Sequence, residues 1–431
     1  MKTAVTQREL GYTEAACALA HERFAGWGQP VRAAEFMGPL SAEIVRRVLG
    51  EMQVRHPLLR ARLVGHDAGY RFVIDSPPLA VRVLARPDSP SYHALEEAEH
   101  AAPIDPAGPL WRATVLLDGV PERGRHVLIY SSHHAISDGL SACRFVEEFL
   151  RGCAAAADGV AIEDSPRPLP PAIEEQLPRS PTWAEYAATL QQAAAGRPAM
   201  DPWPYAEVSP VDARIPRVVP FAAIAVGPLR TRAAQAGVSV NAALAAAMLQ
   251  TAAVLAGGRL ATTFTTSVNL RSRVVPPRAL ADVDCCMINV HTGHTVDPDV
   301  RFWALARAYA DELSVQLPGQ SATPAAFDFN ALSQRIDAGM MARMTGFPLR
   351  LGLSNCGLYP FPTRHGAFTL ERLHFHTSRR AGAYVGFLHA VTVGESLNLC
   401  FSYAEPLVAG AWVQAFVAGV VQALAGASAG E

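Results

Sequence analysis

A run of prolines near the middle of the chain divides it into two parts. An alanine- and glycine-rich stretch that begins near residue 154 leads into Pro166, Pro168, Pro170, Pro171, Pro178 and Pro181. Each proline fixes φ and removes a backbone donor, so neither a helix interior nor a central strand can continue through this segment. We therefore expect a linker or crossover at residues 166–220. It would join an N-terminal lobe at 1–165 to a C-terminal lobe at 221–431.

The N-terminal part alternates between strand and helix patterns. Ser41 can cap a helix that ends near His56, because apolar residues follow it at helical spacing. Short β-branched and aromatic runs predict strands at 70–74, 79–84, 111–117 and 126–132. The stretch 138–151 carries the apolar and charged faces of an amphipathic helix. These patterns predict an α/β lobe.

The C-terminal part repeats this alternation after a short helical segment at 183–195. Helices are expected at 241–255, at 302–317 and from 408 onward. Strands are expected at 261–269, 286–292, 351–355, 373–376, 384–393 and 397–403. The two most apolar stretches, 241–257 and 408–427, are rich in alanine and glycine and contain glutamine, so we expect buried helices there and no membrane span.

Composition and charge exclude several classes of function. The chain has 431 residues, half of them apolar, and a formal charge of only −2 with both signs mixed along it. It lacks the concentrated positive charge that nucleic-acid binding requires. The seven cysteines are scattered without a C-x-x-C pair, which predicts a reducing compartment, no disulfide framework and no metal site. The first eleven residues lack the apolar core of a secretory signal, so we expect a cytoplasmic protein.

The sequence His-His-Ala-Ile-Ser-Asp-Gly at 133–139 carries the strongest chemical signal. It follows an apolar strand pattern and opens an amphipathic helix, so His134 stands where a strand ends and a helix begins. A histidine at such a junction can face a cleft as a general base, and the positive end of the helix dipole keeps it neutral. Gly139 is the type of residue that allows a close approach of the backbone.

These residues alone leave other interpretations open. A His-His pair also occurs in metal sites, although no third ligand stands here at a recognised spacing. His133 and His134 could equally be two structural histidines at the end of a strand. From the residues themselves, the structural and catalytic interpretations are balanced.

The motif resembles the HHxxxDG signature of condensation domains of nonribosomal peptide synthetases. It is similarly found in the polyketide-associated acyltransferases of mycobacteria, in wax ester synthases and, more distantly, in plant BAHD acyltransferases and chloramphenicol acetyltransferase. Other stretches that resemble these families stand in the expected order: RHPLLRARL at 55–63, IDPAGPLWR at 104–112, SVNLRSR at 267–273, MINVH at 287–291 and LSNCG at 353–357. Leu63 replaces the usual aromatic residue, and the DFGWG motif of plant BAHD enzymes is missing.

The resemblance implies an α/β fold of two chloramphenicol-acetyltransferase-like sandwich lobes, a pseudo-dimer with a tunnel between them and His134 near its middle. The donor would be acyl-coenzyme A or the phosphopantetheine arm of an acyl or peptidyl carrier protein, and no permanently bound cofactor or metal is implied. His134 would take the proton of an alcohol or amine acceptor and later protonate the departing thiolate. We expect a monomer.

Roles for further residues follow from the same resemblance. Asp138 would point away from the histidine and form a structural ion pair, with Arg271 as first candidate and Arg60 as second. The alternative for Arg60 is a solvated position at a helix exit. Backbone amides near Gly139 would stabilise the oxyanion, and Ser354 and Asn355 are weaker candidates that could instead form a turn.

Three functions remain open at this stage. The first is an O-acyltransferase of polyketide, lipid or peptide metabolism, which the LSNCG stretch favours. The second is a stand-alone condensation enzyme that forms an amide, which the close match of HHAISDG and RHPLLRAR to peptide-synthetase versions favours. The third is a noncatalytic recruitment module. The presence of His134 argues against the third function, because such a module has no use for the base.

Overall fold

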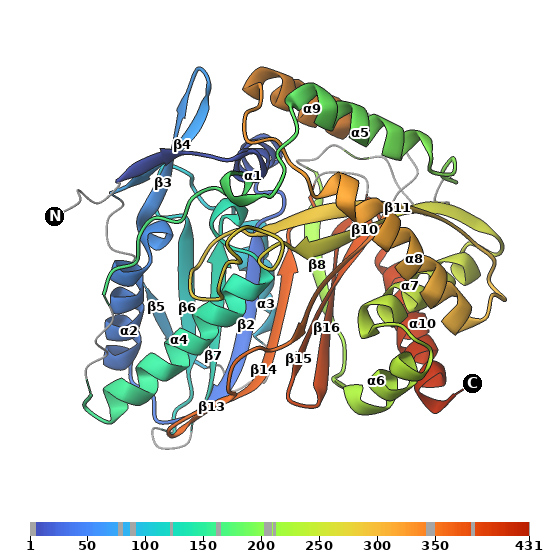
Figure 1. Ribbon diagram of the computed structural model, residues 1–431. Helices are drawn as coiled ribbons and strands as arrows, with labels where there is room; N and C mark the ends of the chain where they lie inside the picture. Colours follow the sequence, from blue (N-terminus) through green and yellow to red (C-terminus); the bar gives the residue numbers. More distant parts are fainter. Residues whose placement is uncertain are drawn as a thin grey trace.

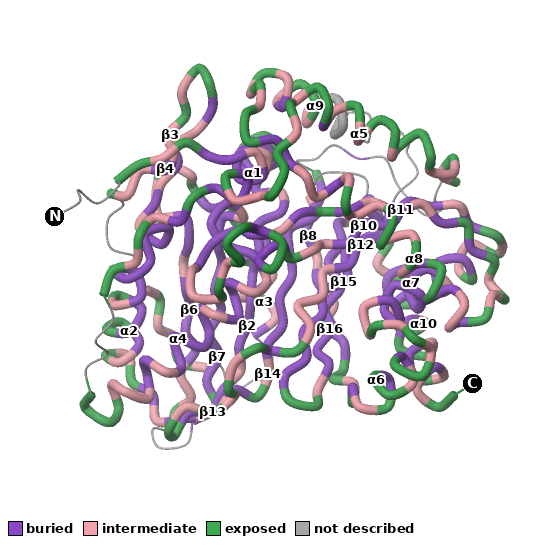
Figure 2. The backbone as a smooth tube through the Cα atoms, viewed as in Figure 1, coloured by how far each residue is buried: buried purple, intermediate pink, exposed green. Residues whose placement is uncertain are grey.

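Two mixed β-sheets stand side by side, each covered by helices (Figure 1). The computed structural model describes residues 6–75, 81–86, 92–120, 124–160, 165–201, 209, 213–341, 350–380 and 384–430. Most residues of the central strands in both sheets are buried (Figure 2). The fold therefore has two lobes, each with its own α/β core, as the sequence predicts.

The first sheet has six strands within the described residues. Their order is β13 (Arg364–His365), β14 (Phe368–Thr377), β2 (Pro30–Met37), β7 (Arg125–Ser132), β6 (Trp111–Leu117) and β5 (Arg82–Ala85). Alternate residues of a strand face opposite sides of a sheet. Thus Ala34 and Phe36 of β2 pack with α2 (Ala42–Arg55) and α4 (Gly139–Ala157), while Val31 and Ala33 pack in a smaller cluster beside α3 (His93–Ala101).

The second sheet forms the other lobe. Its strands are β11 (Met287–Val296), β10 (Leu260–Asn269), β12 (Arg350–Leu358), β15 (Tyr384–Val393), β16 (Ser396–Glu405) and β8 (Ile215–Pro220), with β9 (Ile224–Ala225) also paired to β16. The helices of this lobe are α6 (Val226–Gln235), α7 (Val240–Leu255), α8 (Phe302–Gln320) and α10 (Gly410–Ala429). The alanine-rich α7 is buried almost all round, between the sheet, α8 and α10, and is the centre of the larger core.

Smaller elements flank the two lobes. A three-stranded sheet contains β1 (Gln7–Glu9), β4 (Gly69–Ile74) and β3 (Ala61–His66), and beside it lies α1 (Tyr12–Arg23). Figure 1 shows α5 (Trp183–Ala195) and α9 (Phe329–Met341) above the junction of the lobes. The 3-10 turns are η1 (Pro57–Arg60), η2 (His134–Ile136) and η3 (Ile173–Gln176).

The predicted domain boundaries need two corrections. The segment 166–220 is not only a linker, because its last strand, β8, pairs with β16 in the second sheet. The segment 221–431 does not stay in the second lobe, because β13 and β14 cross over and extend the first sheet beside β2. In Figure 1 the orange β14 stands next to the blue β2. Strand patterns predict strands but not the sheet that each one joins, and this crossover ties the lobes together.

In the part of the chain that the structure describes, one helix, α10, is long and apolar enough to cross a membrane, and the sharply bent pair of α6 and α7 passes the same test when taken together. In the structure Trp412, Phe416, Val420 and Leu424 of α10 are buried in the core of the second lobe. The length and composition of α10 therefore have an explanation in the packing of this lobe.

Candidate active site

The histidine motif lies between the end of β7 and the start of α4. His133 turns inward: it is fully buried, its Nδ1 accepts a hydrogen bond from the backbone N–H of Ala135 at 3.1 Å, and its ring packs against His21 at 4.3 Å. The backbone N–H of His133 donates to the carbonyl of Leu110 at 2.8 Å. These contacts give His133 a structural place in the turn that carries His134.

His134 instead lines a cavity of about 230 Å³ between the two lobes. The first lobe and its crossover strand contribute Cys17, Trp27, Gly28, Pro30, Arg32, His134, Asp138, Gly139, Leu140, Phe375, Thr377 and Arg379. The second sheet and the loops that follow it contribute Ser267, Val268, Asn269, Arg271, Met287, Asn289, Ser354, Asn355, Cys356, Phe387 and His389. The cavity is thus built from segments that are far apart in the sequence.

The surroundings of His134 keep its imidazole neutral. Burial lowers the pKa of His134 to about 4, and the positive charges of Arg32 and Arg379 act in the same direction, against a backbone hydrogen bond and the charge of Asp138. A neutral imidazole has a lone pair available to accept a proton near pH 7. The site therefore holds a base in its unprotonated form.

Asp138 is held by groups other than the histidine ring. Arg271 Nη1 donates to Asp138 Oδ2 at 2.7 Å, and the backbone N–H of Cys286 donates to the same oxygen at 2.8 Å. The other oxygen, Oδ1, accepts from the backbone N–H of Ser141 at 2.8 Å, which makes Asp138 the N-cap of α4. Burial raises the pKa of Asp138, but the ion pair with Arg271 and these hydrogen bonds outweigh it and lower the pKa overall.

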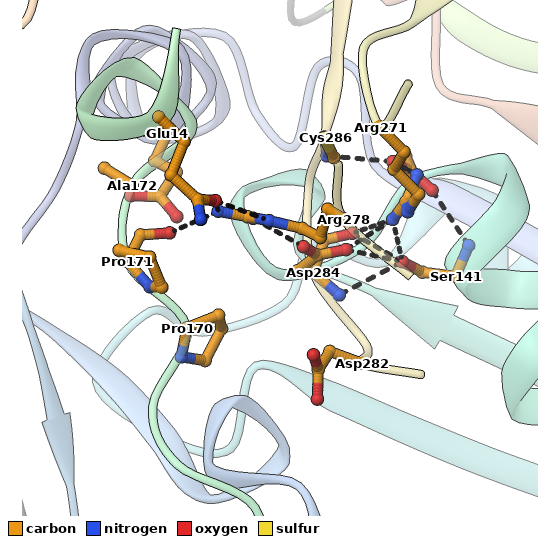
Figure 3. Close-up of polar contacts among 12 residues, drawn as sticks. Glu14, Ser141, Pro170, Pro171, Ala172, Arg271, Arg278, Asp282, Asp284 and Cys286 are labelled. Atoms are coloured by element: carbon orange, nitrogen blue, oxygen red, sulfur yellow. Dashed lines mark hydrogen bonds and ion pairs between the residues drawn. The ribbon is translucent and has the colours of Figure 1, made fainter. Parts of the chain in front are cut away.

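The ion pair belongs to a larger network between the lobes (Figure 3). Arg271 also donates to Asp284 and to the hydroxyl of Ser141, and Arg278 Nη1 lies 2.6 Å from the second oxygen of Asp284. Arg278 in turn donates to the carbonyl of Pro171 at 3.0 Å. Segment 270–286, which joins β10 to β11, is thereby tied to the N-terminus of α4, where it lies across the first lobe in Figure 1.

The N-terminus of α4 faces the cavity at Gly139 and Leu140. Within the described residues, no group accepts a hydrogen bond from the backbone N–H of either residue. A Cβ atom at position 139 would overlap the Sγ atom of Cys356, so this close approach requires glycine. The first turn of α4 therefore offers two amide donors at the cavity that His134 also lines.

Comparison with known families identifies the chain. The profile of the wax ester synthase/diacylglycerol acyltransferase catalytic domain matches residues 80–295, half of the chain and the part that contains the histidine motif. The chain belongs to the condensation-domain acyltransferase superfamily. The profile of the phthiocerol/phthiodiolone dimycocerosyl transferase C-terminus matches residues 225–396 of this acyltransferase. No curated protein matches it in sequence.

Solved structures show that this acyltransferase has the chloramphenicol-acetyltransferase-like fold. Trichothecene 15-O-acetyltransferase from Fusarium sporotrichioides aligns with a TM-score of 0.74 at 14% identity, covering 97% of this chain and 95% of that one. Polyketide synthase associated protein 5 from Mycobacterium tuberculosis aligns at 0.66 and 17% identity, covering 98% and 99%. The starter condensation domain of rhizomide synthetase, in complex with C8-CoA, aligns at 0.70 and 16% identity, covering 98% and 94%. The predicted fold class is confirmed.

The structure brings most of the predicted site residues together, with one correction. Ser354 and Asn355 both line the cavity, as a contact with substrate would require, but they lie within strand β12 and not in a turn. Asn355 Oδ1 accepts the backbone N–H of Gly357 at 2.9 Å, where the pairing of β12 with β15 becomes irregular. Arg60 does not reach Asp138: it ends η1 beside α2, and within the described residues no ion pair joins the two. The physical reason is that Arg271 and two backbone amides already occupy the carboxylate.

Several cavity residues of this acyltransferase lie outside the motifs that the sequence reveals. Arg32, Arg379 and His389 line the cavity and are all buried. Arg32 lies in β2, where it donates to the hydroxyls of Ser132 (2.5 Å) and Ser137 (3.0 Å). The signal that could have revealed Arg32 is a charged residue in the mostly apolar stretch 30–37, because buried charges need a specific reason.

Thiols also lie close to the base. Cys17 and Cys356 line the cavity, and Cys285 Sγ is 3.9 Å from His134 Nδ1. A hydrogen bond with Cys17 and burial raise the pKa of Cys285, and a hydrogen bond with Cys143 and burial raise the pKa of Cys356. Both groups therefore stay in the thiol form, which is a poor nucleophile. Among the described residues, no three His, Cys, Asp or Glu side chains gather as a metal site would require.

Proposed function

We propose that this acyltransferase moves an acyl group from a thioester to an alcohol, with His134 as the general base. The observation that carries the proposal is the neutral imidazole of His134 in the cavity between the lobes. A base of this kind contributes when the proton that it removes lies within hydrogen-bond reach. The cavity provides the space in which an acceptor hydroxyl and a thioester carbonyl could meet beside the ring.

The reaction balances without a covalent enzyme intermediate. His134 takes the hydroxyl proton as the acceptor oxygen attacks the thioester carbonyl carbon and forms a tetrahedral oxyanion. The carbon–sulfur bond then breaks, the ester leaves, and His134 returns the proton to the departing thiolate. One alcohol and one thioester give one ester and one thiol, with no net change in protons.

Two groups are suited to stabilise the oxyanion. The backbone N–H groups of Gly139 and Leu140 have no acceptor among the described residues and stand at the positive end of the α4 dipole. The hydroxyl of Ser354, which lines the cavity from strand β12 of the second sheet, is a second donor. We assign the amides the larger share, because backbone donors are fixed before the reaction begins.

The donor and acceptor classes rest on the proteins that this chain resembles. The structural neighbour from rhizomide synthetase was solved with C8-CoA, which supports coenzyme A thioesters as donors, and the condensation-domain neighbours leave a phosphopantetheinyl carrier protein as the other source. The 15-O-acetyltransferase and the wax ester synthase profile favour an alcohol acceptor over an amine. Amide formation is the second candidate, supported by the condensation-domain neighbours. We place this activity in the cytoplasm, where the acyl thioesters would be supplied.

A panel of acyl-coenzyme A donors and alcohol or amine acceptors tests the proposal, with free thiol as the readout. His134→Ala should lower turnover by roughly 10²–10⁴-fold, the usual loss for a general base. His365→Ala is the matched control, because His365 lies in β13 and does not line the cavity. Near-normal turnover of a folded His134→Ala variant at saturating substrate would contradict the mechanism. Absence of acyl transfer by the unmodified protein across donors and acceptors would favour the recruitment module.

A further inference from the structure

Arg379 is a buried cation in the wall of the same cavity. It follows β14, and only 8% of its surface is exposed. Its guanidinium lies 4.0 Å from the ring centre of Phe387, 5.3 Å from that of Tyr384 and 5.7 Å from that of Trp27. Three aromatic rings therefore pack around the guanidinium and stabilise its position in the cavity wall.

Among the residues that the structure describes, this guanidinium has no partner of opposite charge. No hydrogen bond or ion pair joins Arg379 to any other residue in the part of the chain that the structure describes. The other arginines of the cavity differ: Arg271 pairs with Asp138 and Asp284, and Arg32 donates to serine hydroxyls. A buried charge is unfavourable unless it is paired. Arg379 is therefore a buried positive charge that no described carboxylate neutralises.

The described residues of the cavity wall carry more positive than negative charge. They include three arginines but only one carboxylate, Asp138, which is already paired with Arg271. His389 in β15 and His100 in α3 are near enough to Arg379 to interact with its charge. Burial lowers the pKa of both histidines, and the charge of Arg379 acts in the same direction, so they stay neutral and add no competing cation near pH 7. The aromatic rings around Arg379 supply no anion either.

We propose that Arg379 binds a carboxylate of the substrate, so that this acyltransferase acts on a hydroxy acid or carries a dicarboxylic acyl group. The planar guanidinium can grip a carboxylate with two parallel hydrogen bonds, which a neutral ester or amide cannot match. The carboxylate site adds a substrate class to the proposed function. The assignment to a substrate rests on the proposed acyl-transfer reaction, whereas carboxylate binding does not. Arg379 is a specificity-determining residue in this account, not a group that acts on the reacting atoms.

Equilibrium binding tests the carboxylate site without any acyl transfer. Benzoate and its neutral counterpart benzamide are titrated by calorimetry into the unmodified protein and into Arg379→Gln. The unmodified protein should prefer benzoate, and Arg379→Gln should bind benzoate roughly 10- to 100-fold more weakly with benzamide unchanged, the loss typical of a hydrogen-bonded charge. Arg380→Gln is the matched control, because Arg380 is the next residue but does not line the cavity.

Two results would overturn the carboxylate site. One is equal binding of benzoate and benzamide by the unmodified protein, and the other is an equal loss of benzoate binding in Arg380→Gln. If Arg379→Gln does not fold, Arg379→Lys replaces it, because lysine keeps the charge but cannot form the two parallel bonds. This variant should bind benzoate more weakly than the unmodified protein does, and unchanged binding would count against the proposal.

Kinetics with matched substrate pairs then show which substrate carries the carboxylate. One pair compares 4-hydroxybutyrate with its methyl ester as acceptors of acetyl-coenzyme A, and the other compares succinyl- with butyryl-coenzyme A as donors. Arg379→Gln should raise KM for the charged member of one pair only, and equal changes for charged and neutral members would contradict the proposal. If benzoate binding depends on Arg379 but no acceptor is acylated, the carboxylate site stands and the proposed function fails.

Discussion

Arg271 Nη1 donates to Asp138 Oδ2 at 2.7 Å and joins the loop after β10 to the N-terminus of α4. The same guanidinium also pairs with Asp284, which Arg278 contacts from its other side, so Arg271 is shared between two buried carboxylates. Burial raises the pKa of Asp284, and the nearby charge of Asp138 raises it further, against the pairing with Arg271 and Arg278. Arg271 therefore stabilises two buried carboxylates that would otherwise repel each other.

This arrangement predicts unequal effects on stability. Arg271→Ala leaves Asp138 without its ion pair and Asp284 with only Arg278, and should lower the free energy of unfolding by about 3–5 kcal/mol. Asp138→Ala should cost less, because Arg271 keeps Asp284 and the main further loss is the cap of α4, worth about 1 kcal/mol. Thermal and denaturant unfolding of both variants checks this order.

The double variant distinguishes an ion pair that couples the two residues from two residues that contribute to stability independently. Losses for Asp138→Ala plus Arg271→Ala should sum to less than the two single losses, with a coupling of roughly 0.5–3 kcal/mol. Activity need not return, since the turn that carries His134 is still poorly held. Strictly additive losses would show that the contact between these two residues contributes nothing to stability.

The pKa of His134 predicts the acidic limit of activity. Because burial lowers this pKa to about 4, the base stays neutral near pH 7 and is protonated only as the pH falls toward 4. The rate, kcat/KM, should therefore fall with a midpoint near pH 4, with folding followed by circular dichroism at each pH. A midpoint near 6.5, the ordinary value for histidine, would show that the ring is more solvated than the structure indicates.

Stability should fall in the same acidic range. The unfolded chain takes up protons on its histidines near pH 6.5, whereas buried histidines such as His134 and His294, both with a pKa of about 4, stay neutral in the folded state. The unfolded state then binds more protons, so stability is lost as the pH falls from about 6.5 to 4. A free energy of unfolding that stays constant over this range would contradict the burial of these rings.

Cysteine chemistry offers the clearest rival mechanism. Cys285 lies 3.9 Å from the ring of His134, yet its pKa is raised, so the thiol does not ionise to attack a thioester. Intact-protein mass spectrometry after mixing with an acyl-coenzyme A donor alone should show no acyl adduct. Cys285→Ala, Cys17→Ala and Cys356→Ala should each keep most of the activity. A stoichiometric adduct that disappears in one of them would replace direct transfer with an acyl-enzyme.

Much of the fold could be predicted because strand and helix patterns are local. The strands Trp111–Leu117 and Tyr384–Val393 and the helix Trp183–Ala195 have the predicted bounds, and Ser41 caps α2 through the backbone N–H of Ile44. The central strand β2 was missed, since Arg32 and Glu35 interrupt its apolar pattern. Only the folded structure shows the hydroxyls and the Tyr130 ring that accommodate Arg32.

The site, like the fold, has residues that a local sequence motif reveals and residues that only the folded structure reveals. His134, Asp138 and Gly139 are neighbours in the sequence, so a short motif locates them. The pairing of Asp138 with Arg271 was expected from the resemblance, whereas its sharing with Asp284 was not. Arg379 could not be found from the sequence, because two arginines after a strand are typical of a solvated loop. Its burial depends on the rings of Trp27, in the loop that follows α1, and of Tyr384 and Phe387 in β15.

The close approach at Gly139 gives a final prediction about how α4 is positioned. A Cβ at this position would meet Cys356 Sγ, so Gly139→Ala should lower stability by about 1–3 kcal/mol through overpacking and should shift the amides that face the cavity. Removing the sulfur in Gly139→Ala plus Cys356→Ala should restore most of that stability. Gly50→Ala in α2 is the control, because a Cβ there meets nothing within 4 Å and alanine favours the helix by roughly 0.5–1 kcal/mol. Unfolding of these variants and their acyl-transfer rates decide the matter: if Gly139→Ala is as stable and active as the unmodified protein, the contact with Cys356 does not set the position of α4.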